Sequence, residues 1–492
     1  MILQQKLIES IPWFDCLTLR SNIIMKIEQI YTGCLAQGTY YIISEGEAVS
    51  IDPLREINPY LERLKKDDVK LKYIFETHFH ADFVSGHLDL QKATGAQIVY
   101  GPTAKPGFEA HIAKDGEMLN VGKIKIKVLH TPGHTLESVC YLLFSDNEKP
   151  YAVFTGDTLF IGDVGRPDLA QKAADMTQEQ LAAILYRSLR EKLMVLPDEV
   201  IVYPAHGAGS ACGKSMSKET QSTIGAQKHS NYALRADMDE AEFIKEVTSG
   251  LMPPPGYFPA NVAMNKNGYD SINEVMERGL NALDAATFEN IANRENALVL
   301  DTRNASEFSQ GFIPNSINIG LDGQFAPWVG ALIPDVKQKI LIVTEEGKEE
   351  ETLTRLARVG YDWVIGYLQG GIASWKAAGK ELDTVNRISA EKFAAEEGKT
   401  DDEIIIDIRR PAEFESGHVA GATNIPLDFI NDQISAIPKN KPFYVYCGGG
   451  YRSMIASSIL KARGWENFKE IEGGFGAISK TNVKKESGQL TL

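Results

Sequence analysis

The chain has 492 residues, of which 43% are hydrophobic and 24% charged, and its formal net charge is −15 at pH 7. This length exceeds what one hydrophobic core normally supports, so we expect two to four domains of a globular protein. The acidic balance argues against nucleic acid or an anionic membrane surface as a partner, and no apolar run approaches the roughly 20 residues that span a bilayer.

Residues 1–24 mix charged and polar residues with short apolar pieces, and they lack the hydrophobic region and cleavage site of a secretory signal. A strand-like run begins at Met25, so we expect an N-terminal extension, with Met1 and Met25 both candidate native starts. The five cysteines are odd in number and widely scattered, which does not indicate a disulfide framework. We therefore expect a cytoplasmic protein.

Residues 25–250 alternate short apolar runs, predicted as strands, with helical patterns such as residues 177–196. Four loops that follow predicted strands carry metal-binding residue types: His78, His80 and Asp82; His130 and His134; Asp157; and His206. Strand ends meet at one edge of a sheet, where ligands usually bind, so these side chains are expected to converge. One histidine alone is commonly a hydrogen-bonded core residue, whereas four such loops indicate a metal site.

These motifs resemble the metallo-β-lactamase fold over the whole first region. The family pattern is Thr-His-x-His-x-Asp-His, followed by a later His, a bridging Asp and a last His. Phe83 stands where this pattern has a histidine of the second metal site. The resemblance therefore implies one metal ion, not two.

Within that superfamily the sequence is most similar to the persulfide dioxygenases, which oxidise a low-molecular-weight thiol persulfide with O2 to sulfite. The resemblance implies one Fe(II) per chain, held by His78, His134 and Asp157. Two imidazoles and one carboxylate form a facial triad that leaves positions for O2 and a substrate sulfur. The remaining residues are then expected to orient ligands or water through hydrogen bonds: His80, Asp82, His130 and His206.

A zinc-dependent hydroxyacyl-thioester hydrolase of the glyoxalase II kind is the alternative on the same fold. Such a site needs a metal-bound water made nucleophilic at neutral pH, often with a second cation. His80 would be a fourth ligand in a zinc form, and Phe83 argues against this alternative.

Two further residues of the first region are candidates for substrate contact. Arg166 follows the Asp157 strand and is expected either to bind an acidic thiol carrier or to be a structural arginine in a turn. Cys212 lies in a Gly-rich loop a few residues after His206. It is either a buried, inert thiol or a residue that meets the substrate or accepts its persulfide sulfur.

Residues 251–280 are rich in Pro, Gly and Asn and are predicted to be a linker. The chain then repeats itself, because residues 281–382 and 387–485 align from Asp301 with Asp407 to the paired glycines near their ends. Each copy alternates strands and helices over about a hundred residues, the size of one small α/β domain.

The last copy ends a predicted strand at Cys447 and starts a helix near Ser453, so backbone N–H groups and the helix dipole point at the sulfur. Together with the upstream motif this resembles a rhodanese domain, in which the loop cysteine carries a persulfide. The resemblance implies catalysis by Cys447 and Arg452. The expected substrate-binding residues are Gly448, Gly449, Gly450, Tyr451 and Ser453. A phosphatase or arsenate reductase is less well matched, because four residues separate Cys447 from Arg452 and those enzymes have five.

The middle copy has Thr344 at the cysteine position and Glu349 at the arginine position, with further glutamates around them. An acidic loop repels anions, and a threonine cannot carry a sulfane sulfur. Residues 281–382 are therefore predicted to be an inactive rhodanese-like domain.

The predicted fold class is α/β: a metallo-β-lactamase αββα sandwich followed by two rhodanese-like α/β domains. The whole chain resembles bacterial persulfide dioxygenase–rhodanese fusion proteins of sulfide detoxification. The resemblance implies that sulfite from the iron domain receives a second sulfur from Cys447 to give thiosulfate, and that the chain forms a homo-oligomer. A non-enzymatic sulfur carrier or sensor with a structural metal is a further alternative.

Overall fold

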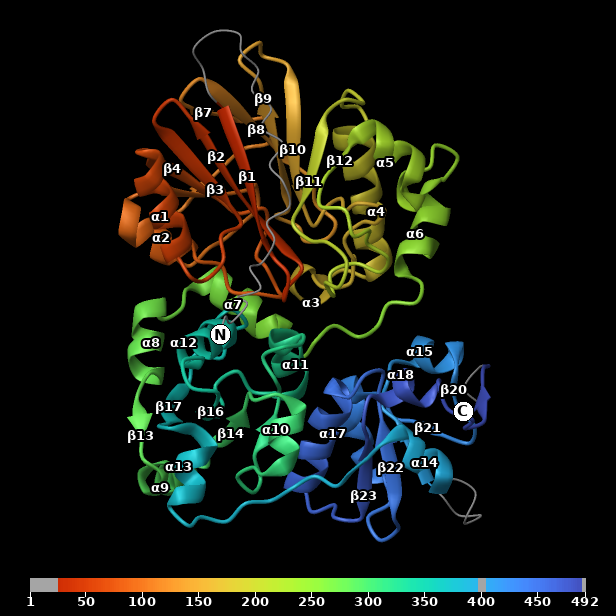
Figure 1. The fold of residues 1–492 in the computed structure, drawn as a ribbon. Helices are drawn as coiled ribbons and strands as arrows, with labels where there is room; N and C mark the ends of the chain where they lie inside the picture. The colour runs from red at the N-terminus through yellow and green to blue at the C-terminus, as the bar shows by residue number, and fades with distance from the viewer. Residues whose placement is uncertain (1–24, 397–403, 489–492) are drawn as a thin grey trace, which may run out of the picture.

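The computed structural model describes residues 25–396 and 404–488, and the expected extension of residues 1–24 lies outside the described residues. Three α/β units follow one another along the chain (Figure 1). The first contains two six-stranded sheets, and the other two contain one five-stranded sheet each. The predicted arrangement, an αββα sandwich followed by two smaller α/β domains that repeat each other, is confirmed.

The first sheet has the order β1-β2-β3-β4-β5-β6. Its strands are β1 (Met25–Thr32), β2 (Gln37–Ser44), β3 (Glu47–Ile51), β4 (Lys70–Phe75), β5 (Gln97–Tyr100) and β6 (His111–Ile112). The second sheet, of order β12-β11-β10-β9-β8-β7, consists of β7 (Met118–Val121), β8 (Ile124–His130), β9 (Val139–Phe144), β10 (Pro150–Gly156), β11 (Ile201–Pro204) and β12 (Ser222–Thr223). The helices of this unit are α1 (Asn58–Asp67), α2 (His87–Thr94), α3 (Gln171–Ala174), α4 (Gln178–Ser188), α5 (Ile224–Ser230) and α6 (Glu240–Thr248).

The two sheets pack face to face, and helices cover their outer faces (Figure 1). Aromatic side chains fill the space between the sheets, where the rings of Tyr40 and Phe154 are 4.9 Å apart. Helix α4 begins after Thr177 because Thr177 and Gln180 exchange side-chain and backbone hydrogen bonds in a capping box. The apolar face of α4 then packs on the second sheet, and α1 and α2 pack on the first.

Four of these strands end at the same place in the sandwich. Strands β4, β8, β10 and β11 are each followed by one of the loops that carry metal-binding residue types. The backbone joins these loops to one another, because Gly38 N donates to Ala205 O at 2.8 Å and Ala205 N donates to Gly156 O at 3.1 Å. The sandwich thus gathers residues that are far apart in the sequence.

The middle and last units share one sheet topology, with all neighbouring strands parallel. The middle sheet, of order β13-β17-β16-β14-β15, consists of β13 (Ala282–Leu283), β14 (Leu298–Asp301), β15 (Ile317–Asn318), β16 (Ile340–Val343) and β17 (Val364–Leu368). The last sheet, of order β18-β23-β22-β19-β21, consists of β18 (Arg387–Ile388), β19 (Ile404–Asp407), β21 (Thr423–Asn424), β22 (Phe443–Tyr446) and β23 (Phe468–Ile471). A short pair of β20 (His418–Val419) and β24 (Lys485–Glu486) lies beside it.

Helices flank both sheets. The middle unit has α9 (Ala285–Glu295), α10 (Ala305–Gln310), α11 (Phe325–Leu332), α12 (Glu349–Ala357) and α13 (Gly371–Ala377). The last unit has α14 (Ala390–Glu396), α15 (Pro411–Ser416), α16 (Ile430–Gln433), α17 (Tyr451–Ala462) and α18 (Gly474–Ile478). Even buried side-chain contacts repeat, because Arg303 Nη2 lies 2.6 Å from Asp301 Oδ2 and Arg409 Nη2 lies 2.6 Å from Asp407 Oδ2.

Residues 251–280, expected to be a linker, contain two helices, α7 (Phe258–Asn267) and α8 (Ile272–Gly279). Proline at the start of α7 and a capping box between Ser271 and Glu274 at the start of α8 account for where they begin. The segment packs on both neighbours, because Asn265 bonds to the backbone of His80 while α8 contacts α12. It is therefore part of the interface between the first two units.

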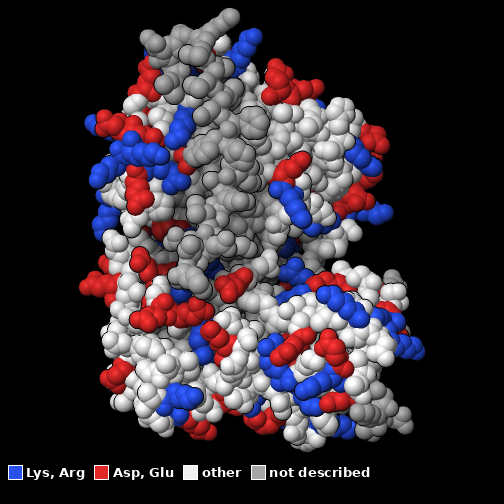
Figure 2. Space-filling model, in the orientation of Figure 1, with Lys and Arg blue, Asp and Glu red and all other residues white. Residues whose placement is uncertain are grey.

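Among the described residues, no helix has the length and apolar composition needed to cross a membrane. Figure 2 shows basic and acidic side chains interspersed over the visible face of the described part of the molecule. This mixed surface agrees with a chain that has 51 basic and 66 acidic residues.

Candidate metal centre and sulfur-transfer loop

Three buried side chains, His78, His134 and Asp157, meet where the two sheets of the first unit end. Their candidate ligand atoms all lie within 4.8 Å of one another. Asp157 Oδ2 is 3.5 Å from His134 Nε2 and 3.9 Å from His78 Nε2. Neither carboxylate oxygen of Asp157 has a hydrogen-bond partner among the described residues, although the residue is only 2% exposed. A carboxylate buried in this way is costly unless a cation binds it, so these residues fit a metal ion.

Hydrogen bonds fix both histidines so that Nε2 faces Asp157. His134 Nδ1 lies 2.9 Å from the carbonyl oxygen of Arg166, which can only accept, so Nδ1 carries the proton. His78 Nδ1 lies 3.0 Å from Thr77 Oγ1, whose own proton is donated to Asp52 Oδ2 at 2.9 Å. Burial, together with the neighbouring histidines, holds the pKa of His78 well below its usual value. Both rings thus present the neutral nitrogen that a metal requires.

His80, Asp82 and His206 form a second buried group against the first. His206 Nε2 lies 3.3 Å from Asp82 Oδ2 and 3.6 Å from Asp157 Oδ1. His80 Nε2 lies 3.0 Å from Asp52 Oδ1. Burial opposes the charge of His80, but Asp52 and other carboxylates outweigh it and raise its pKa to about 9.

Phe83 closes one side of this second group. It is fully buried, its ring lies 4.3 Å from the ring of His80, and it belongs to the apolar cluster that joins the first unit to the middle one. Tyr257 of the segment before α7 lies in the same cluster and donates from its hydroxyl to Asp82 O at 3.2 Å. An apolar ring therefore fills the space beside the second group.

His130, expected to orient ligands or water, does not join either group. Its Nε2 lies 2.9 Å from Leu136 O, and its backbone N–H donates to Asp115 at 2.9 Å. These bonds hold the ends of the loop that carries His134.

Arg166 connects His134 to the loop of Cys212. Its carbonyl oxygen accepts a hydrogen bond from His134 Nδ1. Its backbone N–H donates to Cys212 O at 3.0 Å, and its Nη1 donates to Ala211 O at 3.2 Å. Its other donors bond to Asp168, at 2.7 Å for each oxygen, and to Met252 O. These contacts favour the structural alternative for Arg166, which aligns two parts of the site.

The thiol of Cys212 lies at the metal centre. Its Sγ and ligand atoms of Asp157 and His206 lie within 4.8 Å of one another, and the residue is 1% exposed. Burial, followed by the carboxylates of Asp82 and Asp157, raises the pKa of Cys212 well above its usual value. Cys212 therefore faces the site as a neutral thiol.

Asp52, Glu76 and Gly165 were not predicted from the sequence. Asp52 and Glu76 form a buried cluster with His80, and their position directly after strands β3 and β4 was the available signal. A side chain at Gly165 would lie 1.9 Å from Asp157 O and 3.0 Å from His134 Nδ1. Only glycine allows the backbone of residues 165–166 to approach the ligands this closely.

The loop of Cys447 lies between β22 and α17 in the last unit. Gly450 N donates to Cys447 Sγ at 3.1 Å, and Gly450 adopts φ 103°, which glycine tolerates best. Helix α17 starts one residue later, so its N-terminal dipole favours negative charge on this sulfur. Gly448 and Gly449 complete the loop, and Cys447 itself is 1% exposed.

Two residues of this loop make contacts other than those expected. Arg452 is bound by Glu413 through both Nη atoms, at 2.6 and 2.7 Å. Tyr451 points away from the sulfur and donates from its hydroxyl to Gly320 O of the middle unit at 2.8 Å. Tyr451 therefore anchors the loop, and Arg452 must exchange Glu413 for an incoming anion.

In the middle unit the corresponding loop lacks these features. Thr344 lies against Thr352, with Oγ1 atoms 3.4 Å apart, and Lys348 pairs with Glu351 at 2.8 Å. The cavity at this place measures only about 50 Å³. This agrees with the predicted loss of sulfur chemistry in the middle unit.

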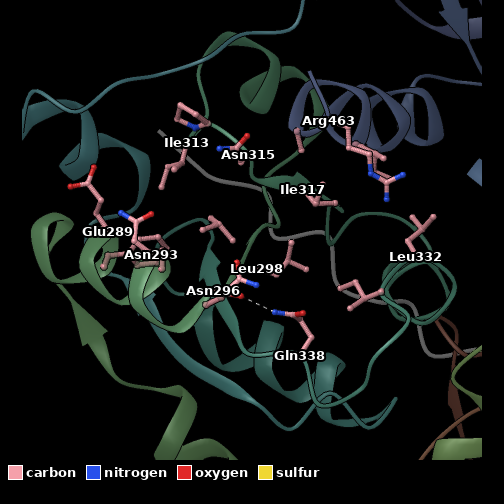
Figure 3. A pocket seen from close by; sticks show the side chains of 18 of the residues that line it. Glu289, Asn293, Asn296, Leu298, Ile313, Asn315, Ile317, Leu332, Gln338 and Arg463 are labelled. Carbon is pink, nitrogen blue, oxygen red and sulfur yellow. Dashed lines mark hydrogen bonds between the residues drawn. The ribbon is translucent and has the colours of Figure 1, made fainter. Parts of the chain in front are cut away.

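A cavity of about 780 Å³ lies between the middle and last units (Figure 3). It is lined by Asn293 and Asn315 of the middle unit and by Ile459 and Arg463 at the end of α17. Cys447 precedes the other end of that 12-residue helix, which is about 18 Å long. The cavity is therefore separate from the sulfur loop.

Comparison with family models agrees with this three-part architecture. The model described as the metallo-beta-lactamase superfamily matches residues 33–206, and the model of the rhodanese-like domain matches residues 284–378 and 389–481. The two rhodanese matches coincide with the two five-stranded units.

Similar proteins carry two different activities. A probable hydroxyacylglutathione hydrolase of Schizosaccharomyces pombe is 37% identical over 180 residues, which cover 36% of this chain and 65% of that protein. The mitochondrial persulfide dioxygenase of Homo sapiens is 32% identical over 211 residues, which cover 42% of this chain and 74% of that protein. The chain thus spans just under two thirds of the yeast relative.

A crystal structure of a metallo-beta-lactamase from Staphylococcus aureus subsp. aureus COL is 31% identical, with a TM-score of 0.62. The match covers 70% of this chain and 99% of that one. Because 70% exceeds the share of the first unit alone, the likeness extends into the repeated part of the chain.

Proposed function

Because the chain belongs to the metallo-beta-lactamase superfamily and carries two rhodanese-like domains, we propose that it is a persulfide dioxygenase coupled to a sulfurtransferase. In this proposal residues 25–250 oxidise a low-molecular-weight thiol persulfide with O2 to sulfite. Residues 387–485 then transfer a sulfane sulfur from Cys447 to sulfite, and thiosulfate is the product. A cytoplasmic homo-oligomer is part of the same proposal.

One observation carries the dioxygenase assignment: the imidazoles of His78 and His134 face an otherwise unbonded carboxylate, and Phe83 fills the space beside His80 in the neighbouring group. His78, His134 and Asp157 would hold one Fe(II) ion, which supplies redox chemistry and open coordination positions when bound. A facial set of two imidazoles and one carboxylate is the donor set that suits this ion.

Neighbouring residues orient the two histidines of the triad through hydrogen bonds. Asp52 orients Thr77, which orients His78, and the carbonyl of Arg166 orients His134. Phe83 and Tyr257 belong to the apolar cluster that packs against the neighbouring group.

Cys212 is proposed to contact the persulfide. It is a neutral thiol at the edge of the metal centre, so it can donate a hydrogen bond to an anionic sulfur without adding negative charge. Arg166 holds its loop through Cys212 O and Ala211 O.

The proposal is tested on anaerobically purified full-length protein by elemental analysis and by an oxygen electrode with glutathione persulfide. We expect one iron per chain and O2 uptake that depends on the persulfide. His78→Ala should abolish both, whereas His130→Ala, which alters a histidine outside the metal group, should keep most of the iron. Iron-free protein with full O2 uptake would contradict the proposal.

The second candidate function is a zinc-dependent hydroxyacyl-thioester hydrolase with a rhodanese tail. The buried group of His80, Asp82 and His206, next to the triad, favours it because it offers donors for a further cation. This candidate predicts zinc in the purified protein and hydrolysis of lactoylglutathione without O2 uptake, so the same preparation distinguishes the two.

A further inference from the structure

The thiol of Cys447 is connected through Ser453 to a buried carboxylate, Glu470. Cys447 Sγ lies 3.4 Å from Ser453 Oγ, and Ser453 Oγ donates to Glu470 Oε1 at 2.5 Å. Ser453 Oγ has a second possible acceptor in Gly450 O at 3.1 Å. We call Cys447, Ser453 and Glu470 the thiol relay, and the structure-based function above assigns no role to Glu470.

Glu470 occupies an unusual place for a carboxylate. It lies in the middle of strand β23 and is fully buried, and its other oxygen, Oε2, accepts from Arg387 Nε at 2.8 Å. Burial raises the pKa of Glu470, while Arg387 and Ser453 oppose this shift. The hydrogen bond from Ser453 places this carboxylate one hydroxyl group away from the thiol.

The inactive middle domain provides an internal comparison. Strand β18 places Arg387 opposite Glu470, and in the middle sheet β13 places Ala282 opposite Tyr367. Counting along the later parts of the two copies, which align without a gap, the positions of Cys447, Ser453 and Glu470 are filled in the middle domain by Thr344, Glu350 and Tyr367. The strand pairing gives Ala282 as the counterpart of Arg387. The domain without the nucleophile has lost every member of the network, whereas the purely structural pair of aspartate and arginine is kept in both domains.

We propose that Glu470, acting through the hydroxyl of Ser453, takes the thiol proton of Cys447 when sulfane sulfur is loaded and returns it when the sulfur leaves. This inference rests on the proposed sulfurtransferase function. Both positions of the proton satisfy the network. With Cys447 as thiol, its proton points to Ser453 and the hydroxyl points to Glu470; with Glu470 protonated, both hydrogen bonds reverse.

In the loading step, Cys447 Sγ attacks the terminal sulfur of R–S–S⁻. The bond between Sγ and the terminal sulfur forms, the S–S bond of the persulfide breaks and RS⁻ leaves, while the thiol proton moves to Ser453 and the hydroxyl proton moves to Glu470. In the release step, sulfite attacks the sulfane sulfur and the S–Sγ bond breaks. Thiosulfate leaves with two negative charges, and Sγ regains the proton along the same path. Neither step needs an oxidant or a reductant.

Other charges face the relay from the surrounding elements. Arg452 of α17 lies near Cys447 but is neutralised by Glu413 of α15. On the other side, Arg387 of β18 is shared between Glu470 and the half-exposed Glu472, which lies 3.5 Å away. Glu472 therefore serves as a matched control, because it has the same arginine partner and does not touch Ser453.

The test is the pH dependence of Cys447 alkylation by iodoacetamide in the full-length protein, followed by mass spectrometry. Glu470→Gln mimics the protonated carboxyl group and removes a negative charge, so the alkylation midpoint should move down by at least one pH unit, with a tenfold faster rate at pH 7. Ser453→Ala removes the bridge but keeps Glu470, so its midpoint should not move down. Glu472→Gln should match the wild type.

Failure of the relay and failure of the sulfurtransferase function give different results. If Glu470→Gln does not lower the midpoint, or if Ser453→Ala lowers it equally, the relay is wrong. Alkylation needs no persulfide. If the wild type forms no thiosulfate but the variants show the expected shifts in alkylation midpoint, only the sulfurtransferase function is refuted. Ser453→Ala leaves the pair of Glu470 and Arg387 intact, so the test does not depend on the folding of one variant. O2 uptake should be unchanged in all three variants.

Discussion

A buried ion pair joins the first domain to the middle one, and its disruption gives a sharp test of how these domains are held. Arg55 is fully buried, and its Nη2 lies 2.9 Å from Asp362 Oδ2 and 2.6 Å from Asp270 O. Its guanidinium lies 4.1 Å from the ring centroid of Tyr269. Its Nε and Nη1 have no hydrogen-bond partner among the described residues, so Asp362 is the carboxylate on which the charge depends.

Asp362→Asn keeps the shape of the side chain and removes the counter-ion. Removing one partner of a buried pair typically costs about 3–5 kcal/mol, because the other charge stays buried and uncompensated. With a urea m-value of about 3 kcal/mol per M, the unfolding midpoint should fall by roughly 1–1.7 M. Burial raises the pKa of Asp362 even though Arg55 opposes this, so the intact pair itself adds little net stability. The double variant Arg55→Met/Asp362→Leu should therefore be close to the wild type.

The assay is urea unfolding followed by tryptophan fluorescence, in which Trp363 reports on the interface. Asp270→Asn is the control, because the side chain of Asp270 is 54% exposed and surface ion pairs contribute little. A loss for Asp362→Asn no greater than that for Asp270→Asn would refute the reasoning. A double variant as unstable as Asp362→Asn would show that packing, not the unpaired charge, causes the loss.

Three further results are expected. Cys447→Ser should keep O2 uptake but yield sulfite in place of thiosulfate, and equal loss of both activities would contradict the division of labour. Gly323→Ala should lower the stability of the last two domains by about 1–3 kcal/mol in the same unfolding assay, because the added methyl group would lie 2.3 Å from the ring of Tyr451. Hydrogen bonds from Arg452 hold the pKa of Glu413 below its ordinary value of 4.5, although burial opposes this. The stability that Glu413 contributes is therefore complete above pH 4.5, and it is lost as the pH falls through the lowered pKa of the folded protein. Glu413→Gln and the wild type should therefore have unfolding midpoints that differ at pH 7 and converge as the pH falls below the lowered pKa, and a constant difference would show that the pair does not titrate as expected.

The positions of the metal-binding residue types could be predicted because each follows a strand. His78, His134 and Asp157 are more than 20 residues apart in sequence, yet strand ends must meet at the edge of a packed sandwich. The duplication could be predicted for a similar reason, because Asp301 and Asp407 begin the same buried motif in both copies.

The contacts that tune each site could not be predicted in the same way. Arg387 and Glu470 are 83 residues apart and meet only because β18 and β23 are neighbours in the sheet. The role of Arg166 depends on its backbone atoms, which form hydrogen bonds with His134 and Cys212. Every residue type has these backbone atoms, so the residue type at position 166 does not predict the contacts. Composition predicted a linker over residues 251–280 but not its two helices, because Pro259 can begin a helix as readily as it can interrupt one.

The contacts of the middle domain suggest a structural role that needs no nucleophile in its own loop. Gln324 lies against Gly209 in the loop that leads to Cys212, at 3.8 Å from the position of an added Cβ, and the adjacent Gly323 lies against Tyr451 of the sulfur loop. One short segment of the middle domain thus contacts the loop beside the candidate metal centre on one side and the loop of Cys447 on the other. Its own loop needs no nucleophile for this purpose, whereas its packing must be kept. Substitutions that enlarge or shorten side chains in this segment should therefore disturb the neighbouring domains more than substitutions at Thr344, which holds the position of Cys447 in the middle copy.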